Sequence, residues 1–201
     1  MNTDSITARR HQFADWEEAE EYYFEQGLTD GLPILPPTEA RVQAMLDYAG
    51  LRPDQVIGVE SIRKKSFSAE KVAINAVMAG CKPEYFPVVV AAVAACCERG
   101  YNFHASSTST NGITTLVLVS GPYANEIGMN SGTVMMGNGN RANATIGRAV
   151  NLVKTNFYGS VPQGRECSMK LGVLYASFVV TDSGADSGAA DATRPFLAAG
   201  R

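Results

Sequence analysis

Residues 69–100, AEKVAINAVMAGCKPEYFPVVVAAVAACCERG, decide the fold, because they hold two apolar helices joined by a short turn. Ser68 opens the first helix and Gly80 closes it, as an N-cap residue and a glycine stop are expected to do. Pro83 begins the second helix, whose body is VVVAAVAACC, and Gly100 ends it. Because a helix that is apolar on every side is buried, we expect the body of the second helix to lie in the core.

Two further helices are predicted on the N-terminal side of this pair. Asp15 caps the first of them, Glu18 stands at the capping-box position, and Gly27 is the stop. Thr38 caps the second, which ends at Gly50. Between the two lies LTDGLPILPPT, a turn followed by a proline-rich extended segment.

Strands are predicted where β-branched and apolar residues run together. The segments are QVIGVESI (55–62), ITTLVLVSG (113–121) and LGVLYASFVV (171–180). The basic stretch that ends at Ser68 reads as a loop. The polar stretch NFHASSTSTNG (102–112) reads as a loop or a strand end.

A fifth helix is predicted to start near Asn143. Ile146, Val150, Val153 and Phe157 follow one another at helical spacing and mark its buried face. Helices and strands are therefore mixed along the chain, which is typical of a layered α/β or α+β domain. We expect a single layered domain with a mixed sheet and about five helices.

The 201 residues are enough for one sizeable domain with its own core. We expect a flexible N-terminus over residues 1–12, a single domain over 13–181, and a flexible tail over 182–201. The tail begins with TDSGADSGAADAT, a stretch of low sequence complexity. No internal repeat interrupts this organisation.

Composition and charge exclude several classes of protein. Hydrophobic residues make up 45% of the chain and charged residues 18%, which is a globular composition. With a net charge of −3 and no basic cluster longer than RKK, we expect no nucleic-acid partner. The first residues lack an apolar signal region, and the longest apolar run, 86–97, is too short to cross a bilayer. The four cysteines contain no CxxC motif, which favours a reducing, cytoplasmic location.

The stretch MMGNGNRANATIGRA (135–149) places amides, glycines and an arginine directly before a predicted helix. A helix N-terminus carries partial positive charge and free N–H groups, and an arginine fork suits a carboxylate or a phosphate. We therefore expect a cradle for a small anionic molecule. The alternative is that these residues only turn the chain and cap the helix. The substrate-binding candidates are Asn138, Gly139, Asn140, Arg141, Asn143, Asn130 and Asn111.

Cys81 and His104 are the candidates for catalysis. Cys81 stands at a helix junction beside Lys82, where a helix N-terminus and a cation would favour the thiolate. The alternative is a small buried hydrophobic residue, which a cysteine at such a junction often is. His104 stands beside SSTST and is either a proton carrier or a structural histidine. Because the body of the chain holds this one histidine, a His-rich metal site would need ligands from a second chain.

Three stretches carry a resemblance: GLTDGLPILPPTEARVQAML, EKVAINAVMAGCKPEYFPVV and NRANATIGRA. They resemble the UGSC-like proteins, a bacterial family in which many members carry a selenocysteine- or cysteine-Gly-Ser-Cys motif. The resemblance covers roughly residues 16–157 and corresponds to the C-terminal region of longer members. This chain has no CGSC tetrapeptide. The resemblance therefore implies a shortened member that forms one subunit of a hetero-oligomer, with the missing parts on a second polypeptide.

Two functions follow from these observations. The first is a subunit of a heteromeric enzyme that holds a small anionic substrate at the cradle and acts by lyase, hydrolase or thiol-redox chemistry. The second is a non-catalytic partner subunit that completes a site on another chain. A metal-dependent enzyme that draws its ligands from the partner is a further alternative. The sequence names no cofactor, and it leaves open whether a metal is bound.

Overall fold

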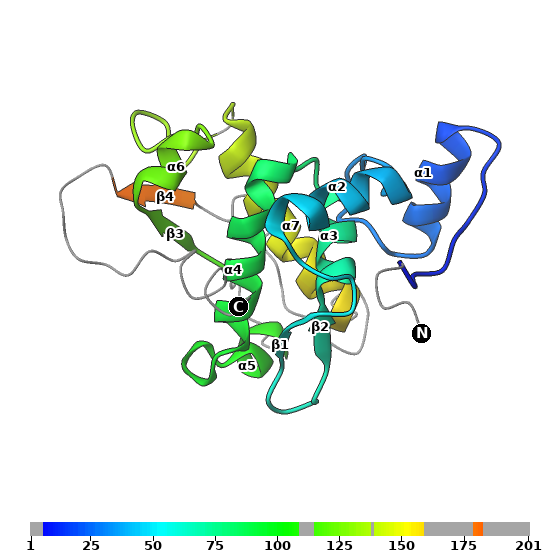
Figure 1. The fold of residues 1–201 in the computed structure, drawn as a ribbon, viewed down its shortest axis with the longest axis horizontal. Coiled ribbons are helices and arrows are strands. Elements are labelled where there is room, and N and C mark those ends of the chain that lie inside the picture. The colour runs from blue at the N-terminus through cyan, green and yellow to red at the C-terminus, as the bar shows by residue number, and fades with distance from the viewer. Residues whose placement is uncertain (1–5, 109–114, 138, 159–178, 183–201) are drawn as a thin grey trace.

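The computed structural model describes residues 6–108, 115–137, 139–158 and 179–182, and it shows a mostly helical α+β fold (Figure 1). The described residues form seven α-helices: α1 (Trp16–Glu25), α2 (Glu39–Ala49), α3 (Ala69–Met78), α4 (Phe86–Cys97), α5 (Phe103–Thr108), α6 (Pro122–Glu126) and α7 (Arg141–Tyr158). They also form two short 3-10 helices, η1 (Pro83–Tyr85) and η2 (Arg99–Tyr101). The strands are β1 (Val56–Val59), β2 (Ser66–Ser68), β3 (Val117–Ser120) and β4 (Val179–Asp182).

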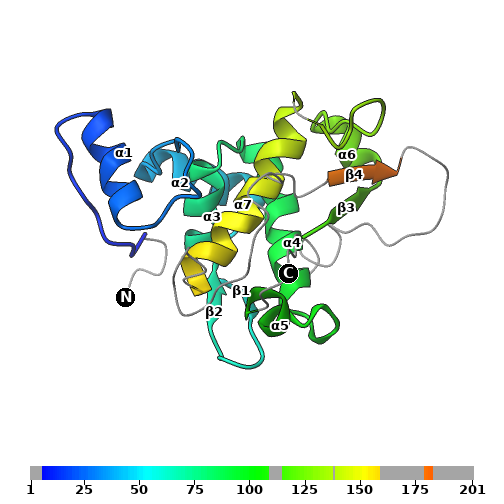
Figure 2. The same cartoon turned by 180° about the vertical axis from the view of Figure 1, so that it is seen from behind.

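The centre of the fold is helical. The long helix α7 crosses α3 and α4, and α2 packs on α3 as well (Figure 2). The helices meet through fully buried side chains, among them Leu46, Phe86, Ile146 and Leu152. The two predicted apolar helices are confirmed as α3 and α4, and the body of α4 is buried in the core through Val88, Val89, Val90 and Val93.

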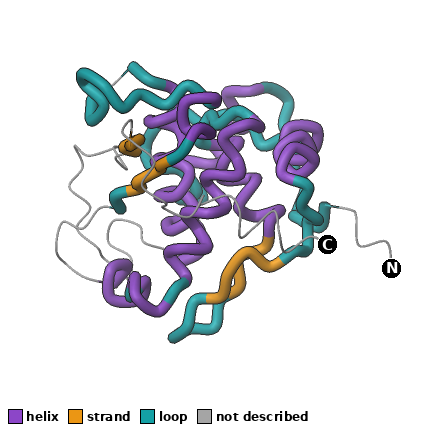
Figure 3. Tube along the Cα trace, turned by 60° about the vertical axis from the view of Figure 1, so that its left-hand side comes forward, coloured by secondary structure: helices purple, strands orange, loops and turns teal. Residues whose placement is uncertain are grey.

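Two small sheets lie at different sides of this helical centre (Figure 3). In the first, β1 and β2 pair antiparallel, with Val59 opposite Ser66. In the second, β3 and β4 pair parallel. The strand β1 lies close against α4, because a Cβ atom added at Gly58 would stand 2.6 Å from the sulfur of Cys97. Only glycine permits this approach of strand and helix.

Some helix ends follow the sequence signals, but Thr38 and Ser68 make no side-chain capping hydrogen bond. The helix expected between Pro83 and Gly100 is also shorter, because α4 covers Phe86–Cys97. Asp15 caps α1 by accepting a hydrogen bond from the Glu18 N–H at 2.9 Å. Gly50 ends α2 in the left-handed conformation with φ of 63°, and Gly80 follows α3 with φ of 90°. The face predicted for the last helix is confirmed, since Ile146 is fully buried.

Three expectations on local structure are wrong. Residues 66–68 form the strand β2 instead of a loop, because they pair with β1. Residues 103–108 form α5 instead of a loop or strand end, and Phe103 anchors this helix against the ring of Phe67. The described strands form two separate sheets instead of one mixed sheet, because the helical centre lies between them.

The N-terminal residues also contact the core. The backbone N–H groups of Thr7 and Ala8 donate to Oε1 of Glu70, and the Thr7 hydroxyl donates to Oε2 at 2.9 Å. The Glu70 side chain is 3% exposed, so these donors compensate the burial of its carboxylate. Within the described parts of the chain, none of the helices has both the length and the apolar character needed to cross a bilayer.

Candidate functional site

The predicted cradle is a loop that its own amides hold together. The buried side chain of Asn143 accepts a hydrogen bond from the Asn130 N–H at 3.0 Å. Its amide nitrogen donates to the carbonyls of Asn130 at 2.9 Å and of Met135 at 3.3 Å. Three backbone groups of the loop are therefore bound by one side chain of α7.

The side-chain amides of Asn140 and Asn130 also form hydrogen bonds within this loop. Asn140 caps α7, since its Oδ1 accepts from the Asn143 N–H at 2.9 Å, and its Nδ2 donates to the Gly128 carbonyl at 2.8 Å. Asn130 donates to the Thr133 carbonyl and accepts from the Gly132 N–H. The turn-forming and capping alternative accounts for these contacts, and the binding of an anion by the same amides stays a prediction.

The Arg141 side chain also forms hydrogen bonds within the protein. Its Nε and Nη2 both donate to the carbonyl of Gly80, at 3.1 and 2.9 Å. This contact ties the first turn of α7 to the C-terminal end of α3, where helix carbonyls lack partners and a cation is favourable. Gly139 adopts a φ of +113°, as the turn before α7 requires. The candidates Asn111 and Asn138 lie outside the described residues.

Cys81 is a buried thiol. Its sulfur donates to the Thr145 carbonyl at 3.3 Å, and the residue is 5% exposed. Burial raises the pKa of Cys81 from 9.0 to about 12, although the hydrogen bond to Thr145 and the charges of Arg141 and Arg148 act in the opposite direction. The expectation of a thiolate at this junction is therefore wrong, because desolvation outweighs the nearby cations.

His104 lies far from Cys81. It stands on α5, just beyond the C-terminal end of α4, whereas Cys81 precedes the N-terminal end of the same helix (Figure 1). Twelve helical residues separate these two ends by about 18 Å. His104 is close enough to Glu60 to contribute to the lowered pKa of that carboxyl. Within the described residues the two candidates therefore do not form one site.

A metal site is not formed from the described side chains alone. No group of three or more His, Cys, Asp or Glu residues in the described part of the chain is placed to hold a metal ion. Any metal site at these residues would thus need ligands from elsewhere.

The structure instead shows a pocket of about 570 Å³, within the range of small-molecule sites. Four parts of the chain line it: the end of α1 and its following loop, the β1–β2 hairpin, α3, and the end of α7. The lining residues are Tyr23, Leu28, Lys64, Lys65, Ser66, Lys71, Ile74, Asn75, Met78, Asn156 and Phe157. Three of these eleven residues are lysines and none is acidic. We call it the lysine pocket.

The hairpin turn that carries Lys64 and Lys65 is held by a buried carboxylate. Glu60 accepts hydrogen bonds from the backbone N–H groups of Ile62 and Arg63. Burial acts to raise the pKa of Glu60, but these two N–H donors and nearby cations hold it below its ordinary value. The Glu60 carboxylate therefore stays ionised and fixes the turn beside the pocket.

The lysines differ in their own contacts. Lys65 Nζ donates to the Phe157 carbonyl at 2.7 Å. Lys71 Nζ lies 5.6 Å from the centre of the Phe157 ring, and no carboxylate of the described residues pairs with it. The backbone N–H of Lys64 donates to the Glu60 carbonyl at 3.0 Å, its side chain has no polar partner in the described part of the chain, and its φ of 57° is unfavourable for a residue other than glycine. Neither Lys64 nor Lys71 is thus paired with a carboxylate of the described residues.

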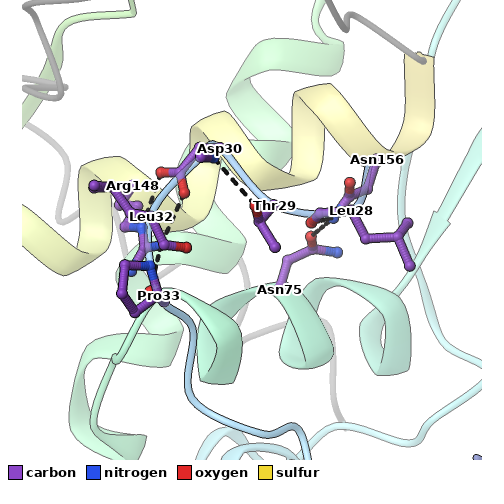
Figure 4. A network of polar contacts seen from close by, with 9 residues as sticks. Leu28, Thr29, Asp30, Leu32, Pro33, Asn75, Arg148 and Asn156 are labelled. Atoms are coloured by element: carbon purple, nitrogen blue, oxygen red, sulfur yellow. Dashed lines mark hydrogen bonds and ion pairs between the residues drawn. The ribbon is translucent and has the colours of Figure 1, made fainter. Parts of the chain in front are cut away.

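The floor and wall of the pocket are built from amides and apolar side chains. Asn156 donates to the Oδ1 of Asn75 at 2.6 Å and to the Leu28 carbonyl at 3.1 Å (Figure 4). Asn75 donates in turn to the Lys71 carbonyl at 2.9 Å. This series of hydrogen bonds explains why Asn75 lies inside the otherwise apolar helix α3, because the bonds join α3 to α7 and to the loop after α1. The sequence pattern showed the asparagine but not its partners.

A second contact fixes the same loop. Arg148 of α7 binds both carboxylate oxygens of Asp30, at 2.9 and 2.8 Å, and also donates to the carbonyls of Leu32 and Pro33 (Figure 4). The two charged side chains are only 16% and 17% exposed. The loop from Leu28 to Pro33 is therefore bound to α7 at two points, Asn156 and Arg148.

Lys154 is a further residue that the sequence analysis missed. It lies on α7 and is 5% exposed. Its Nζ donates to the hydroxyls of Thr115 at 3.0 Å and of Tyr101 at 3.4 Å. Burial lowers the pKa of Lys154, although the nearby Cys96 acts to raise it. Lysines are seldom buried without a carboxylate partner, and none of the described carboxylates pairs with this one.

Replacing Lys154 with methionine is expected to raise the free energy of unfolding by up to about 2 kcal/mol at pH 8, because a buried cation is removed and its apolar stem is kept. Since the folded-state pKa lies below the unfolded value of 10.5, the unfolded chain binds more protons between these two values. The wild-type protein therefore gains stability there as pH rises, and the variant does not. Urea denaturation should show a smaller difference in the free energy of unfolding between the variant and the wild type at pH 10 than at pH 8. An equal difference at the two pH values would contradict the lowered pKa of Lys154.

No family model matches the chain, and no curated protein or solved structure shows significant similarity to it.

Proposed function

We propose that this chain is a subunit of a cytoplasmic enzyme that binds a small anionic substrate in the lysine pocket. One observation supports the proposal above the others. A pocket of about 570 Å³ is lined by three lysines and by no acidic residue, and two of those lysines have no carboxylate partner among the described residues. In a chain of net charge −3, such a local excess of positive charge favours the binding of an anion at this place.

The pocket walls indicate what else the substrate carries. Tyr23, Ile74, Met78 and Phe157 supply apolar surface below the charged rim. A ligand that fits both parts has a carboxylate or phosphate at one end and an apolar or aromatic body at the other. The lysines would bind the anionic end as point charges, and the body would lie against the rings.

The reaction type stays open among lyase, hydrolase and thiol-redox chemistry, and the enzyme is proposed to be heteromeric. The resemblance to the UGSC-like proteins supports a second subunit as a partner. A non-catalytic partner subunit is the second candidate, and the buried, protonated thiol of Cys81 favours it. The two candidates are distinguished by assaying the purified chain alone and the chain isolated natively with its partner. An enzyme subunit requires the lysine pocket of this chain for turnover, whereas a non-catalytic partner subunit does not.

Phenyl phosphate is a suitable probe, because it joins an anion to an aromatic ring. We expect it to bind the full chain in titration calorimetry at low salt. The variants Lys64→Met and Lys71→Met should each weaken binding about tenfold, since a charged hydrogen bond is worth roughly 1.5–3 kcal/mol. The matched control is Lys82→Met, because Lys82 is also exposed but lies outside the pocket and pairs with Glu84 at 3.5 Å.

The control variant should bind the probe like the wild-type protein. Equal weakening by all three substitutions would show a general effect of net charge and would remove the support for this pocket. Equal binding of benzyl alcohol, which has the ring but no charge, would overturn the proposal of an anionic substrate.

A further inference from the structure

The lysine pocket carries more positive charge than one carboxylate would offset. Lys64 and Lys71 line it, and neither is paired with a carboxylate of the described residues. Lys65 lines it too and donates to the Phe157 carbonyl at 2.7 Å, a neutral group that leaves the charge of the lysine in place. None of the described residues that line the pocket is acidic. The lining residues therefore leave at least two positive charges at this place without a counter-charge.

The turn that carries Lys64 is built at an energetic cost. The φ of Lys64 is 57°, a left-handed conformation that suits glycine or asparagine better than lysine. The Glu60 carboxylate holds the turn by accepting hydrogen bonds from the Ile62 and Arg63 N–H groups. The Glu60 carbonyl also accepts from the Lys64 N–H at 3.0 Å. Since backbone strain gathers at functional sites, a lysine at this position points to a function for its charge.

The hydrogen-bond donors of the pocket suit an anion with several oxygens. Three lysine ammonium groups and the Ser66 hydroxyl belong to the lining, and arginine is absent from its described residues. The planar fork of an arginine matches a flat carboxylate, whereas a lysine is a point charge with three rotatable donors. A phosphate monoester offers three acceptor oxygens and a charge of about −1.5 to −2 at pH 7. It therefore meets the donors and the charge of this lining more fully than a carboxylate does.

The charged and the aromatic parts of the pocket meet at Phe157. Lys65 donates to its carbonyl, and the Nζ of Lys71 lies 5.6 Å from the centre of its ring. An anion bound by these lysines would therefore lie beside the ring. We propose that the lysine pocket takes a phosphate monoester in its dianionic form, with an aromatic or apolar ester group, in preference to a carboxylate or another monoanion. This inference rests on the proposed function, because it needs the pocket to bind an anion.

Phenyl phosphate and phenyl sulfate test the proposal as a matched pair. Both carry a phenyl ring and three terminal oxygens on a tetrahedral centre, but at pH 8 the phosphate is a dianion and the sulfate is a monoanion. Titration calorimetry of the full chain at low salt measures both affinities. We expect phenyl phosphate to bind about tenfold more tightly, since its second charge meets the second lysine that has no carboxylate partner.

The same pair of ligands at pH 5 shows whether charge causes the difference. A phosphate monoester takes up its second proton at about pH 6, so phenyl phosphate is mostly a monoanion at pH 5. Phenyl sulfate keeps one charge at both pH values, so a change in its affinity reports on the protein alone. We expect the two affinities to lie within about twofold of each other at pH 5, because the two ligands then carry nearly equal charge.

Lys64→Asn tests the lysine whose backbone is strained. Asparagine tolerates a left-handed φ, so the variant should be at least as stable as the wild type. The preference for phenyl phosphate at pH 8 should fall from about tenfold to about threefold, because one of the two charges without a partner is lost. Lys82→Met is the matched control, since Lys82 pairs with Glu84 outside the pocket, and it should leave the preference unchanged.

The outcomes separate this inference from the proposed function. If phenyl sulfate binds as tightly as phenyl phosphate at pH 8, and Lys71→Met weakens both, the pocket binds anions but has no preference for a dianion, and the inference is wrong. If neither ligand binds, the proposed function fails together with it. If Lys64→Asn lowers the stability and keeps the full preference, Lys64 serves the turn alone and its assignment to the ligand is overturned.

Discussion

Replacing Arg148 with alanine is expected to lower the free energy of unfolding by about 3–5 kcal/mol, the usual cost of breaking a largely buried ion pair. The substitution removes both bonds to Asp30 and leaves its carboxylate uncompensated at 17% exposure. It also removes the donors to the carbonyls of Leu32 and Pro33. Urea denaturation followed by circular dichroism measures the effect.

The pair of Arg52 and Asp54 is the matched control. It has the same residue types joined by a single contact at 3.2 Å, and its side chains are 64% and 47% exposed. Arg52→Ala should therefore change the free energy of unfolding by about 0–1 kcal/mol, since water screens such pairs. If Arg148→Ala cost no more than Arg52→Ala, the clamp would contribute nothing to stability. A double-mutant cycle with Asp30→Ala separates the coupling from the loss of the carbonyl bonds.

Replacing Phe67 with alanine is expected to cost about 3–5 kcal/mol, because a fully buried ring leaves a cavity that the core cannot fill. The same substitution should weaken phenyl phosphate binding in the lysine pocket. The ring of Phe157, which lines that pocket, stacks on Phe67 at 4.3 Å and an interplanar angle of 29°. Denaturation and calorimetry on one preparation measure both effects.

Phe67→Leu is the control for this substitution. Leucine fills most of the volume, so we expect a loss below about 1.5 kcal/mol in stability and little change in binding. Full binding by Phe67→Ala, despite its lower stability, would show that the position of Phe157 does not depend on this stacking.

Signals close together in the sequence predicted the helices well. Asp15 and the Glu18 N–H that it binds are three positions apart, and Gly50 directly follows the last turn of α2. By contrast, α5 contains serines and threonines, which have low helix propensity, and its anchor is the contact of Phe103 with Phe67. A contact between residues so far apart leaves no local pattern, so the sequence predicted a loop there.

Contacts between distant residues also explain why the candidate site could not be predicted from the sequence. The sequence shows that Asn143 and Asn130 carry amides, but it does not show that they bind each other across thirteen positions. Cys81 was expected to be a thiolate because its neighbours are visible in the sequence, whereas the burial that raises its pKa is not. The lysine pocket combines residues from Tyr23 to Phe157, so only the folded chain brings its charges together.

The central position of α7 has a consequence for how the chain folds during synthesis. The partners of this helix were made long before it: Arg148 binds Asp30 across 118 positions, and Asn156 binds the Leu28 carbonyl across 128. As the ribosome releases the chain from its N-terminus, α3 and α4 emerge with an apolar face that α7 has not yet covered. That face therefore stays exposed on the growing polypeptide until residues 141–158 are free to close over it. Such late closure also makes folding slow, because the entropy of a loop of more than a hundred residues is lost before its contacts form.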